Sequence, residues 1–436
     1  MAPAFLAPDN VLLVRRSGKA VITVFTKGSL PSLALLCTCV LLGACGGGTT
    51  KVLSGPGRTV TAIHSTSPGA VAQKLGFPAA ATKNTTRVNG ADPVADAAAV
   101  ALAVYPSAAP GTHPRAVTIA PTGDWQAAIA GSVLMASPIR APILLSGGSS
   151  LPPATADALG ALAPTGSPAA GGAQVIRVGD VPSAGHQRTV SIAGTDPYAL
   201  AASIDRFASA ARGGRPGINV VIASGEDAAS AMPAAGWAAE SGEPVLFVTG
   251  SGIPGPTRQA LISHQHPHIY VLGAPSVISD EVLKQLRKYG SVKRIGDRNT
   301  SDPAANSVAF AEYRDPPCGA GQPCAHVPGS FGWAMRSPGH GYVLLNAHRP
   351  LDAAAASPLS ASGDFGAQLL VNDPSKLPPS VLNFFLNFAT PGYTRQGPTA
   401  AVYNHGWVIG NQHAVSLAVQ AELDLRLEVV PQQVPK

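Results

Sequence analysis

The chain has 436 residues, of which 45% are hydrophobic and only 12% are charged. Such a composition supplies ample apolar side chains for folded cores and excludes a largely disordered protein, and the length is typical of two to four domains. The formal net charge of +6 is concentrated toward residues 1–44. Beyond them we find no lysine and arginine run and no recognition motif of the kind that binds DNA or RNA.

The N-terminal region has the layout of an export signal. Basic residues up to Lys27 precede an apolar run over residues 30–42, which is too short to span a membrane as a helix. The run ends in Leu-Gly-Ala-Cys at Cys45, followed by three glycines. This segment resembles a bacterial lipobox, which implies a signal peptide over residues 1–44, cleavage before Cys45 and a diacylglycerol attached to Cys45. The alternatives are an ordinary signal peptide and a buried helix with a chance match.

Residues 45–85 are rich in glycine, serine, threonine and proline and show no sustained periodicity. After a lipid anchor, this composition predicts a flexible tether. The two cysteines that remain downstream, Cys318 and Cys324, lie close together in the loop Cys-Gly-Ala-Gly-Gln-Pro-Cys. In an exported protein this spacing favours a local disulfide. The alternative, a metal site, would need two further ligands, and only His326 lies nearby.

The remaining chain repeats one α/β unit three times. Each unit opens with a β-branched strand that turns at a glycine and continues through Asp-Pro into a helix. Aspartate accepts the free N–H groups of a helix start, and proline suits the first turn. These helix starts are Asp92-Pro93, Asp196-Pro197 and Asp302-Pro303. A second strand, a small-residue helix, a third strand, another helix and a strand that ends in glycine follow.

The third strand and its turn form the clearest repeated motif. It occurs as APILLSGGSSLP, EPVLFVTGSGIPGP and AQLLVNDPSKLPPS, and we align Pro142, Pro244 and Gln368. Strands that alternate with helices predict right-handed crossovers and mostly parallel sheets with helices on both faces. We therefore expect an α/β fold of three tandem modules. Their expected limits are 86–188, 189–292 and 293–430, the last with the cysteine-containing loop inserted.

This order of motifs resembles the bacterial cell wall-binding repeat 2 family over roughly residues 86–430. The matching residues are Arg87, Gly90 and Asp92, then Gly194, Asp196 and Tyr198, then Arg294, Gly296 and Asp297, with the Pro-Ile-Leu-Leu motif intact at 142–145. The resemblance implies Rossmann-like modules packed about a pseudo-threefold axis. It also implies non-covalent attachment to an anionic cell-wall polymer, in which the Pro-Ile-Leu-Leu segment takes part.

Arginines near the strand ends are candidate contacts for such a polymer. Arg87, Arg177 and Arg294 can pair with phosphates or carboxylates. The alternative is that they lie at solvated strand ends or form salt bridges between modules. Because the leucine and isoleucine side chains of the third strand cannot bind an anion, the adjacent Ser146 and Gly147 are further candidates. Thr249 follows the third strand of the second unit and is a candidate for the same reason.

Other chemistry is less well supported by the sequence. No P-loop occurs, and we expect no nucleotide cofactor. No Gly-x-Ser-x-Gly or His-Glu-x-x-His occurs either. The histidines of 264–268 are interrupted by Pro267 and predict a loop entering a strand rather than a metal site. Trp125, Trp237, Trp333 and Trp407 can stack on sugars, but core packing is the favoured interpretation.

Together these patterns predict a lipid-anchored, extracytoplasmic protein of the cell envelope. We expect it to be non-catalytic, to need no metal or cofactor and to bind an anionic cell-wall polymer; the sequence predicts no oligomeric state. One alternative is a lipoprotein that binds a small ligand in clefts between its modules. A cell-wall hydrolase is less well supported, because the repeats leave no separate catalytic domain.

Overall fold

The computed structural model describes residues 80–296, 298–315, 330–362, 366–393 and 397–431, together with four short strands nearer the N-terminus. The chain divides into two compact units, Met1–His64 and Ser65–Lys436. Cys45, Cys318 and Cys324 lie outside the described residues, so the lipidation and the disulfide stay predictions. Within the described part of the chain, no helix is long and apolar enough to cross a membrane.

The first unit contains two antiparallel strand pairs. One joins β1 (Arg15–Arg16) to β2 (Lys19–Ala20), and the other joins β3 (Val52–Gly55) to β4 (Arg58–Thr61). The first pair lies within the expected signal peptide and the second within the expected tether.

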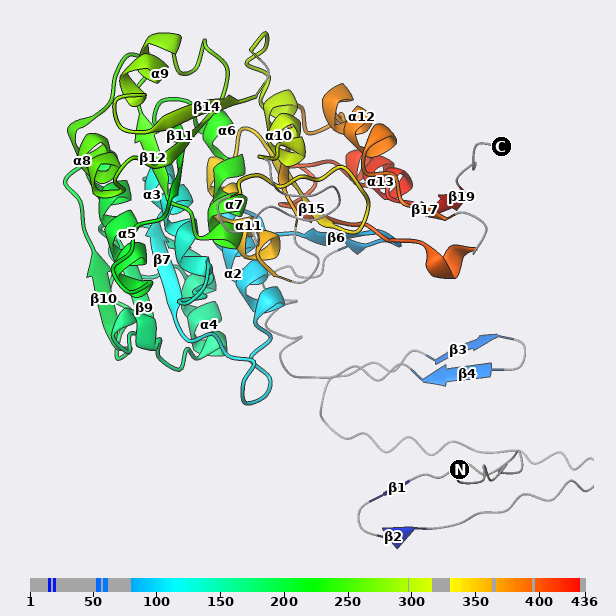
Figure 1. The fold of residues 1–436 in the computed structure, drawn as a ribbon. Coiled ribbons are helices and arrows are strands. Elements are labelled where there is room, and N and C mark those ends of the chain that lie inside the picture. Colours follow the sequence, from blue (N-terminus) through cyan, green and yellow to red (C-terminus); the bar gives the residue numbers. More distant parts are fainter. Residues whose placement is uncertain are drawn as a thin grey trace, which may run out of the picture. The chain divides into compact units, whose positions relative to one another are not determined.

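The second unit contains three larger sheets, which we call sheets I, II and III (Figure 1). Sheet I has the order β10-β9-β7-β8, with strands Thr189–Ile192, Val175–Val178, Val117–Pro121 and Ile143–Ser146. Sheet II has the order β12-β11-β13-β14, with strands Val245–Val248, Asn219–Ser224, His268–Leu272 and Ser291–Ile295. All neighbours within these two sheets are parallel.

Sheet III has the order β16-β15-β18-β6-β5, with strands Gln368–Val371, Gly341–Asn346, His405–Ile409, Thr85–Val88 and Ala80–Ala81. Only β5 runs antiparallel to its neighbour within this sheet. A separate pair joins β17 (Gly392–Tyr393) to β19 (Val430–Pro431). The mostly parallel α/β fold expected from the sequence is therefore confirmed.

The sheets do not coincide with the sequence repeats. The first strand of each repeat pairs with the sheet of another repeat: β10 completes sheet I, β14 completes sheet II, and β6, from the start of the first repeat, pairs with β18 of the third. The three repeats therefore interlock, and the last sheet is completed by the beginning of the folded chain.

The first helix of each repeat begins where the sequence predicts. These helices are α2 (Pro93–Val104), α5 (Pro197–Ala211) and α10 (Pro303–Glu312). Asp92, Asp196 and Asp302 each accept the N–H three residues ahead, at 2.9, 2.8 and 2.9 Å. Proline occupies the first turn of each helix. The cap contacts confirm the Asp-Pro signal in all three repeats.

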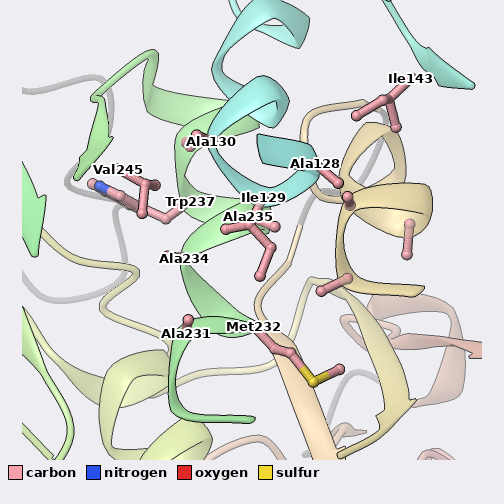
Figure 2. Close-up of a cluster of buried hydrophobic side chains, with 14 of the residues drawn as sticks. Ala128, Ile129, Ala130, Ile143, Ala231, Met232, Ala234, Ala235, Trp237 and Val245 are labelled. Atoms are coloured by element: carbon pink, nitrogen blue, oxygen red, sulfur yellow. The ribbon is translucent and has the colours of Figure 1, made fainter. Parts of the chain in front are cut away.

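Small-residue helices from all three repeats pack together in the interior. They are α3 (Trp125–Gly131) with its extension η1 (Ser132–Met135), α6 (Ala228–Ala231) with α7 (Pro233–Ser241), and α11 (Pro350–Ser360). Figure 2 shows Ile129 of α3 beside Ala235 of α7, and both are fully buried. Because alanine has a small side chain, helix backbones can approach closely. The alanine-rich composition therefore allows these helices to pack against one another.

The remaining helices complete the layers. Third strands are followed by α4 (Pro153–Leu162), α8 (Gly255–Ser263) and α12 (Pro379–Asn387). Last strands are followed by α9 (Asp280–Leu286) in the second repeat and α13 (Leu417–Arg426) in the third. The short 3₁₀ turns η2 (Pro168–Ala170) and η4 (Pro398–Ala400) lie in loops.

The third strands β8, β12 and β16 are edge strands, yet all their residues are buried. The first helix of the same repeat covers each edge, which protects it from pairing with another chain. In sheet III the covering helix α10 also makes a hydrogen bond to the edge strand β16. The Ser307 hydroxyl accepts the N–H of Leu370 at 3.1 Å.

Strand register corrects the sequence alignment of the third motif. The N–H groups of equivalent residues in β7, β11 and β15 donate to the carbonyls of Pro142, Pro244 and Ala367. Ala367, not Gln368, therefore corresponds to Pro142, and our alignment was wrong by one residue. A shift by one reverses which face each side chain occupies. Gln368 takes the place of Ile143 and donates to the carbonyl of Ala353 at 2.8 Å.

Candidate functional site

Open parallel sheets bind ligands at the carboxyl ends of their strands, so we located the predicted site residues relative to these edges. Ser146, Gly147 and Arg177 belong to sheet I, Thr249 and Arg294 to sheet II, and Arg87 to sheet III. The residues predicted to bind the polymer are therefore distributed over three sheets.

Arg87 and Arg294 occupy equivalent positions and point into the protein. Arg87 is 1% exposed. Its guanidinium donates to the Gln420 side chain at 2.8 Å and to the carbonyls of Gly410, Asn411 and Ser416 at 2.8, 3.2 and 3.3 Å. The Arg294 side chain is 4% exposed and donates to the carbonyls of Gly273 and Ile278, both at 2.6 Å. Each arginine thus holds the loop that follows the last strand.

In sheet I an arginine on the neighbouring strand holds the loop that follows the last strand. Ser191 stands where the other sheets have Arg87 and Arg294, and its cross-strand partner is Arg177. The Arg177 guanidinium donates to the carbonyl of Val181, in the loop after β9. Each sheet therefore has an arginine that fastens this loop, and we expect all three arginines to stabilise the fold.

We expect Arg87→Met to lower the free energy of unfolding by about 3 kcal/mol, because several buried carbonyl acceptors lose a charged donor. Urea denaturation measures this change. An unchanged free energy of unfolding would contradict this structural role of Arg87.

The polar residues beside the third strands are also largely enclosed. Ser146 is fully buried. A Cβ atom at Gly147 would meet the Thr122 hydroxyl, so a larger residue here would displace the Thr122 side chain. The Thr249 hydroxyl accepts the N–H of Gly252 at 2.9 Å and closes its own turn. These three residues shape the turns; their role as polymer contacts stays a prediction.

A pocket of about 450 Å³ opens at the carboxyl ends of β6 and β18 in sheet III, and we call it the amide pocket. Its lining residues are Ala80, Arg87, Asn89, Asn411, Gln412, His413 and Leu417. None of the motifs in the sequence predicted this pocket. The sequence Asn-Gln-His directly follows the glycine after β18, whereas the equivalent places in sheets I and II carry Asp-Val-Pro and Ala-Pro-Ser. This difference is the sequence feature that marks the pocket.

A buried ion cluster joins the first and third repeats. Arg349, at the start of α11, approaches Asp96 of α2 at 2.9 Å and Asp352 at 2.5 Å. Both aspartate side chains are fully buried, and Asp96 also accepts the N–H of Gly90 at 2.8 Å. At the position of Arg349 the other repeats have Asp124 and Asp227, which cap their own helices.

Burial, followed by the nearby charge of Asp352, raises the pKa of Asp96 from 3.8 to about 8, although Arg349 opposes this. Burial also raises the pKa of Asp352. Two carboxylates share one guanidinium, so the cluster retains a proton near neutral pH. Both carboxyl groups are fully buried and the cluster links two helices, which indicates a structural role.

A second buried cluster lies between α5 and α8. His264 contacts Asp205 at 2.9 Å and the carbonyl of Gly217 at 2.6 Å. Burial lowers the pKa of His264, but the hydrogen bond and charge of Asp205 outweigh it and the net shift is upward. Ser209 donates to Asp205 at 3.4 Å rather than to the histidine, so this is not the arrangement of a serine nucleophile. Among the described residues, no three His, Cys, Asp or Glu side chains could hold a metal.

The tryptophans mostly pack into cores. Trp237 and Trp333 are 0% and 1% exposed, and Trp125 packs against Phe247 with ring centroids 5.8 Å apart. Trp407 is partly buried and, with His405, lines a pocket of about 320 Å³. Core packing is therefore confirmed for the first three.

Exposed basic side chains gather along α9 and the adjoining edge strand β14. This α9–β14 basic surface consists of Lys284, Arg287, Lys288, Lys293 and Arg298. Asp280 pairs with Arg298 at 2.7 Å, Lys293 pairs with Asp315 at 2.6 Å, and Lys284 pairs with Glu281 at 3.1 Å. In the described part of the chain, Arg287 and Lys288 contact no carboxylate.

Comparison with known proteins bears on the second repeat and on the fold. Residues 191–283 match the family model described as cell wall binding domain 2 (CWB2), which confirms the sequence resemblance there. The fold is similar to Cwp6 from Clostridium difficile, with a TM-score of 0.58 and 16% identity, over 78% of this chain and 48% of that one. It is also similar to Cwp8 from Clostridium difficile, with a TM-score of 0.53 and 17% identity, over 79% and 52%.

This chain therefore spans about half the length of either solved structure. At these identities the similarity establishes the fold alone. Among curated proteins, none matches the chain in sequence.

Proposed function

We propose that this protein, whose residues 191–283 match cell wall binding domain 2, attaches non-covalently to an anionic polymer of the cell wall. In this proposal it is an extracytoplasmic, non-catalytic protein held at the membrane by a lipid on Cys45. The family match in the second repeat and the fold shared with Cwp6 and Cwp8 support a wall-binding role. The lipobox-like sequence supports the anchor.

The α9–β14 basic surface is the proposed binding site for the anionic groups of the polymer. Its residues directly follow the segment that matches the family model. Arg287 and Lys288 are exposed at the end of α9, and Lys293, with 53% of its side chain exposed, projects from the free edge strand. Exposed cations attract phosphate or carboxylate groups spaced along a polymer.

The equivalent helices α9 and α13 each carry two acidic residues and one basic residue, and they differ in the residues that follow. Arg287 and Lys288 follow α9, whereas Glu428 follows α13. In the first repeat a loop replaces the helix. Arg287 and Lys288 thus distinguish the second repeat, which is also the repeat that matches the family model.

Sedimentation with purified cell walls tests this proposal. We expect the wild-type protein to sediment at low salt and to be released by added salt, because screening weakens contacts between exposed charges. Arg287→Glu/Lys288→Glu is expected to weaken sedimentation about tenfold at low salt, since two attractive contacts become repulsive.

A matched charge control is Arg206→Glu/Arg258→Glu. Both arginines are exposed on helices α5 and α8, which pack on β12, the opposite edge of sheet II. This variant should sediment like the wild type at equal net charge. Failure of the wild-type protein to sediment at low salt would refute polymer binding. An equal loss in both variants would refute the assignment to the α9–β14 surface.

A further inference from the structure

We infer that the amide pocket of sheet III binds an uncharged, hydroxyl-rich sugar unit of the wall polymer. This inference rests on the proposed function and deepens it, because it assigns the neutral part of the polymer to a second site. In this arrangement the α9–β14 basic surface attracts the negatively charged groups of the polymer, and the amide pocket binds its sugar.

The position of the pocket and its rigid floor both suit ligand binding. It lies at the carboxyl ends of β6 and β18, the end of a parallel sheet where ligands bind, and its volume of about 450 Å³ is within the range of ligand pockets. Its floor is rigid: Arg87 fixes the carbonyls of Gly410 and Asn411. The Asn411 side chain accepts the N–H of His413 at 2.9 Å, which fixes the turn.

The lining has the chemistry that recognises hydroxyl groups. Asn89 and Gln412 make no hydrogen bond within the described structure, so both amides are available. A carboxamide presents a donor and an acceptor side by side, which matches the hydroxyl groups of a sugar. Leu417, 53% exposed, lies beside them as an apolar surface for the C–H face of the ring.

The same lining argues against charged ligands. No carboxylate lines the pocket, so it offers nothing to a cation. Its guanidinium belongs to Arg87, whose donors are occupied by Gln420 and by loop carbonyls. An anion would therefore meet amides and a histidine ring without a free arginine. A neutral polyol fits best.

The other two sheets lack this combination. By strand register, Ala193 and Gly296 occupy the place of Asn89. Val181 and Pro275 occupy the place of Gln412. Neither sheet can present a pair of amides, so the described structure contains one such site, formed jointly by the first and third repeats.

Calorimetric titration with neutral oligosaccharides tests the inference. The probe is the set of repeating units released from purified walls by aqueous hydrofluoric acid, which cleaves phosphodiesters and leaves uncharged sugars. We expect the wild-type protein to bind this fraction, and Asn89→Ala/Gln412→Ala to raise the Kd at least tenfold. Thermal melting should be nearly unchanged, because neither amide makes a hydrogen bond in the fold. Gln259→Ala, an exposed amide on α8, is the matched control.

The outcomes separate the inference from the proposed function. Equal affinity in the wild-type protein and the double variant, or no binding of the sugars by wild-type protein that sediments with walls, overturns the sugar site and leaves polymer binding intact. If walls do not sediment the protein but the sugars bind through Asn89 and Gln412, the sugar site stands and the anionic contact fails. Loss of sugar binding in the Gln259 control as well would also overturn the assignment.

Discussion

Replacing Arg349 with methionine is expected to lower the free energy of unfolding by about 3–5 kcal/mol, the usual cost of stranding a buried charge. Arg349 is the cation between Asp96 and Asp352, whose side chains have no exposure. Without it, two carboxyl groups remain in the interior between α2 and α11. Urea denaturation near pH 7.5 measures the loss. Arg298→Met, at an exposed arginine, is the control and should change stability by less than about 0.5 kcal/mol.

The pH dependence identifies the cause. The pKa of Asp96 is raised in the folded protein from 3.8 to about 8, so the folded state binds this proton more tightly than the unfolded state. The resulting stabilisation is complete below about pH 4 and is lost as pH rises through 8. The wild-type protein should therefore lose stability over this window, and Asp96→Asn should flatten the loss. The cost of Arg349→Met should be greater at pH 9 than at pH 5, and an equal cost at both values would contradict the assignment.

Truncation of Trp237 to alanine is expected to cost about 4 kcal/mol. Trp237 of α7 is fully buried, and its ring centroid lies 4.9 Å from that of Phe331, 5.2 Å from Trp333 and 6.1 Å from Phe310. These partners belong to the third repeat, so the indole joins the second repeat to the third. Chemical denaturation measures the loss, and coincident transitions by fluorescence and circular dichroism would show that the repeats unfold together.

Two further variants define this contact. Trp237→Phe keeps a ring but removes the N–H that donates to Glu243, so we expect a smaller loss of about 2 kcal/mol. Trp407→Ala truncates a partly exposed tryptophan and is expected to cost less than Trp237→Ala. Should Trp237→Ala leave stability unchanged, the second and third repeats would not depend on this cluster.

Features governed by neighbouring residues were predictable from the sequence. The Asp-Pro helix starts are all confirmed, because the cap contact spans only three residues. The apolar third strands are buried as expected, because a continuous run of large aliphatic side chains is stable only inside. The order of these local signals was enough to predict an α/β fold of repeated units.

The roles of the arginines could not be predicted from neighbouring residues in the sequence. The sequence does not distinguish a polymer contact from a strand-end role for Arg87, because its acceptors, Gly410 and Asn411, lie more than 300 positions ahead. Whether a guanidinium meets a polymer or a carbonyl depends on which loop the fold brings to it. The buried pair of His264 and Asp205 depends in the same way on the packing of α8 against α5.

By itself, the sequence determined the repeated α/β units, their helix starts and the resemblance to a wall-binding family, because local hydrogen bonding and hydrophobic periodicity set these features. Only the tertiary structure decided how the units join. Strand β6 enters the last sheet, Arg349 pairs with Asp96, and Ala367 takes the register of Pro142. These pairings bring together residues remote in the chain. The amide pocket likewise exists only because the first and third repeats close on each other.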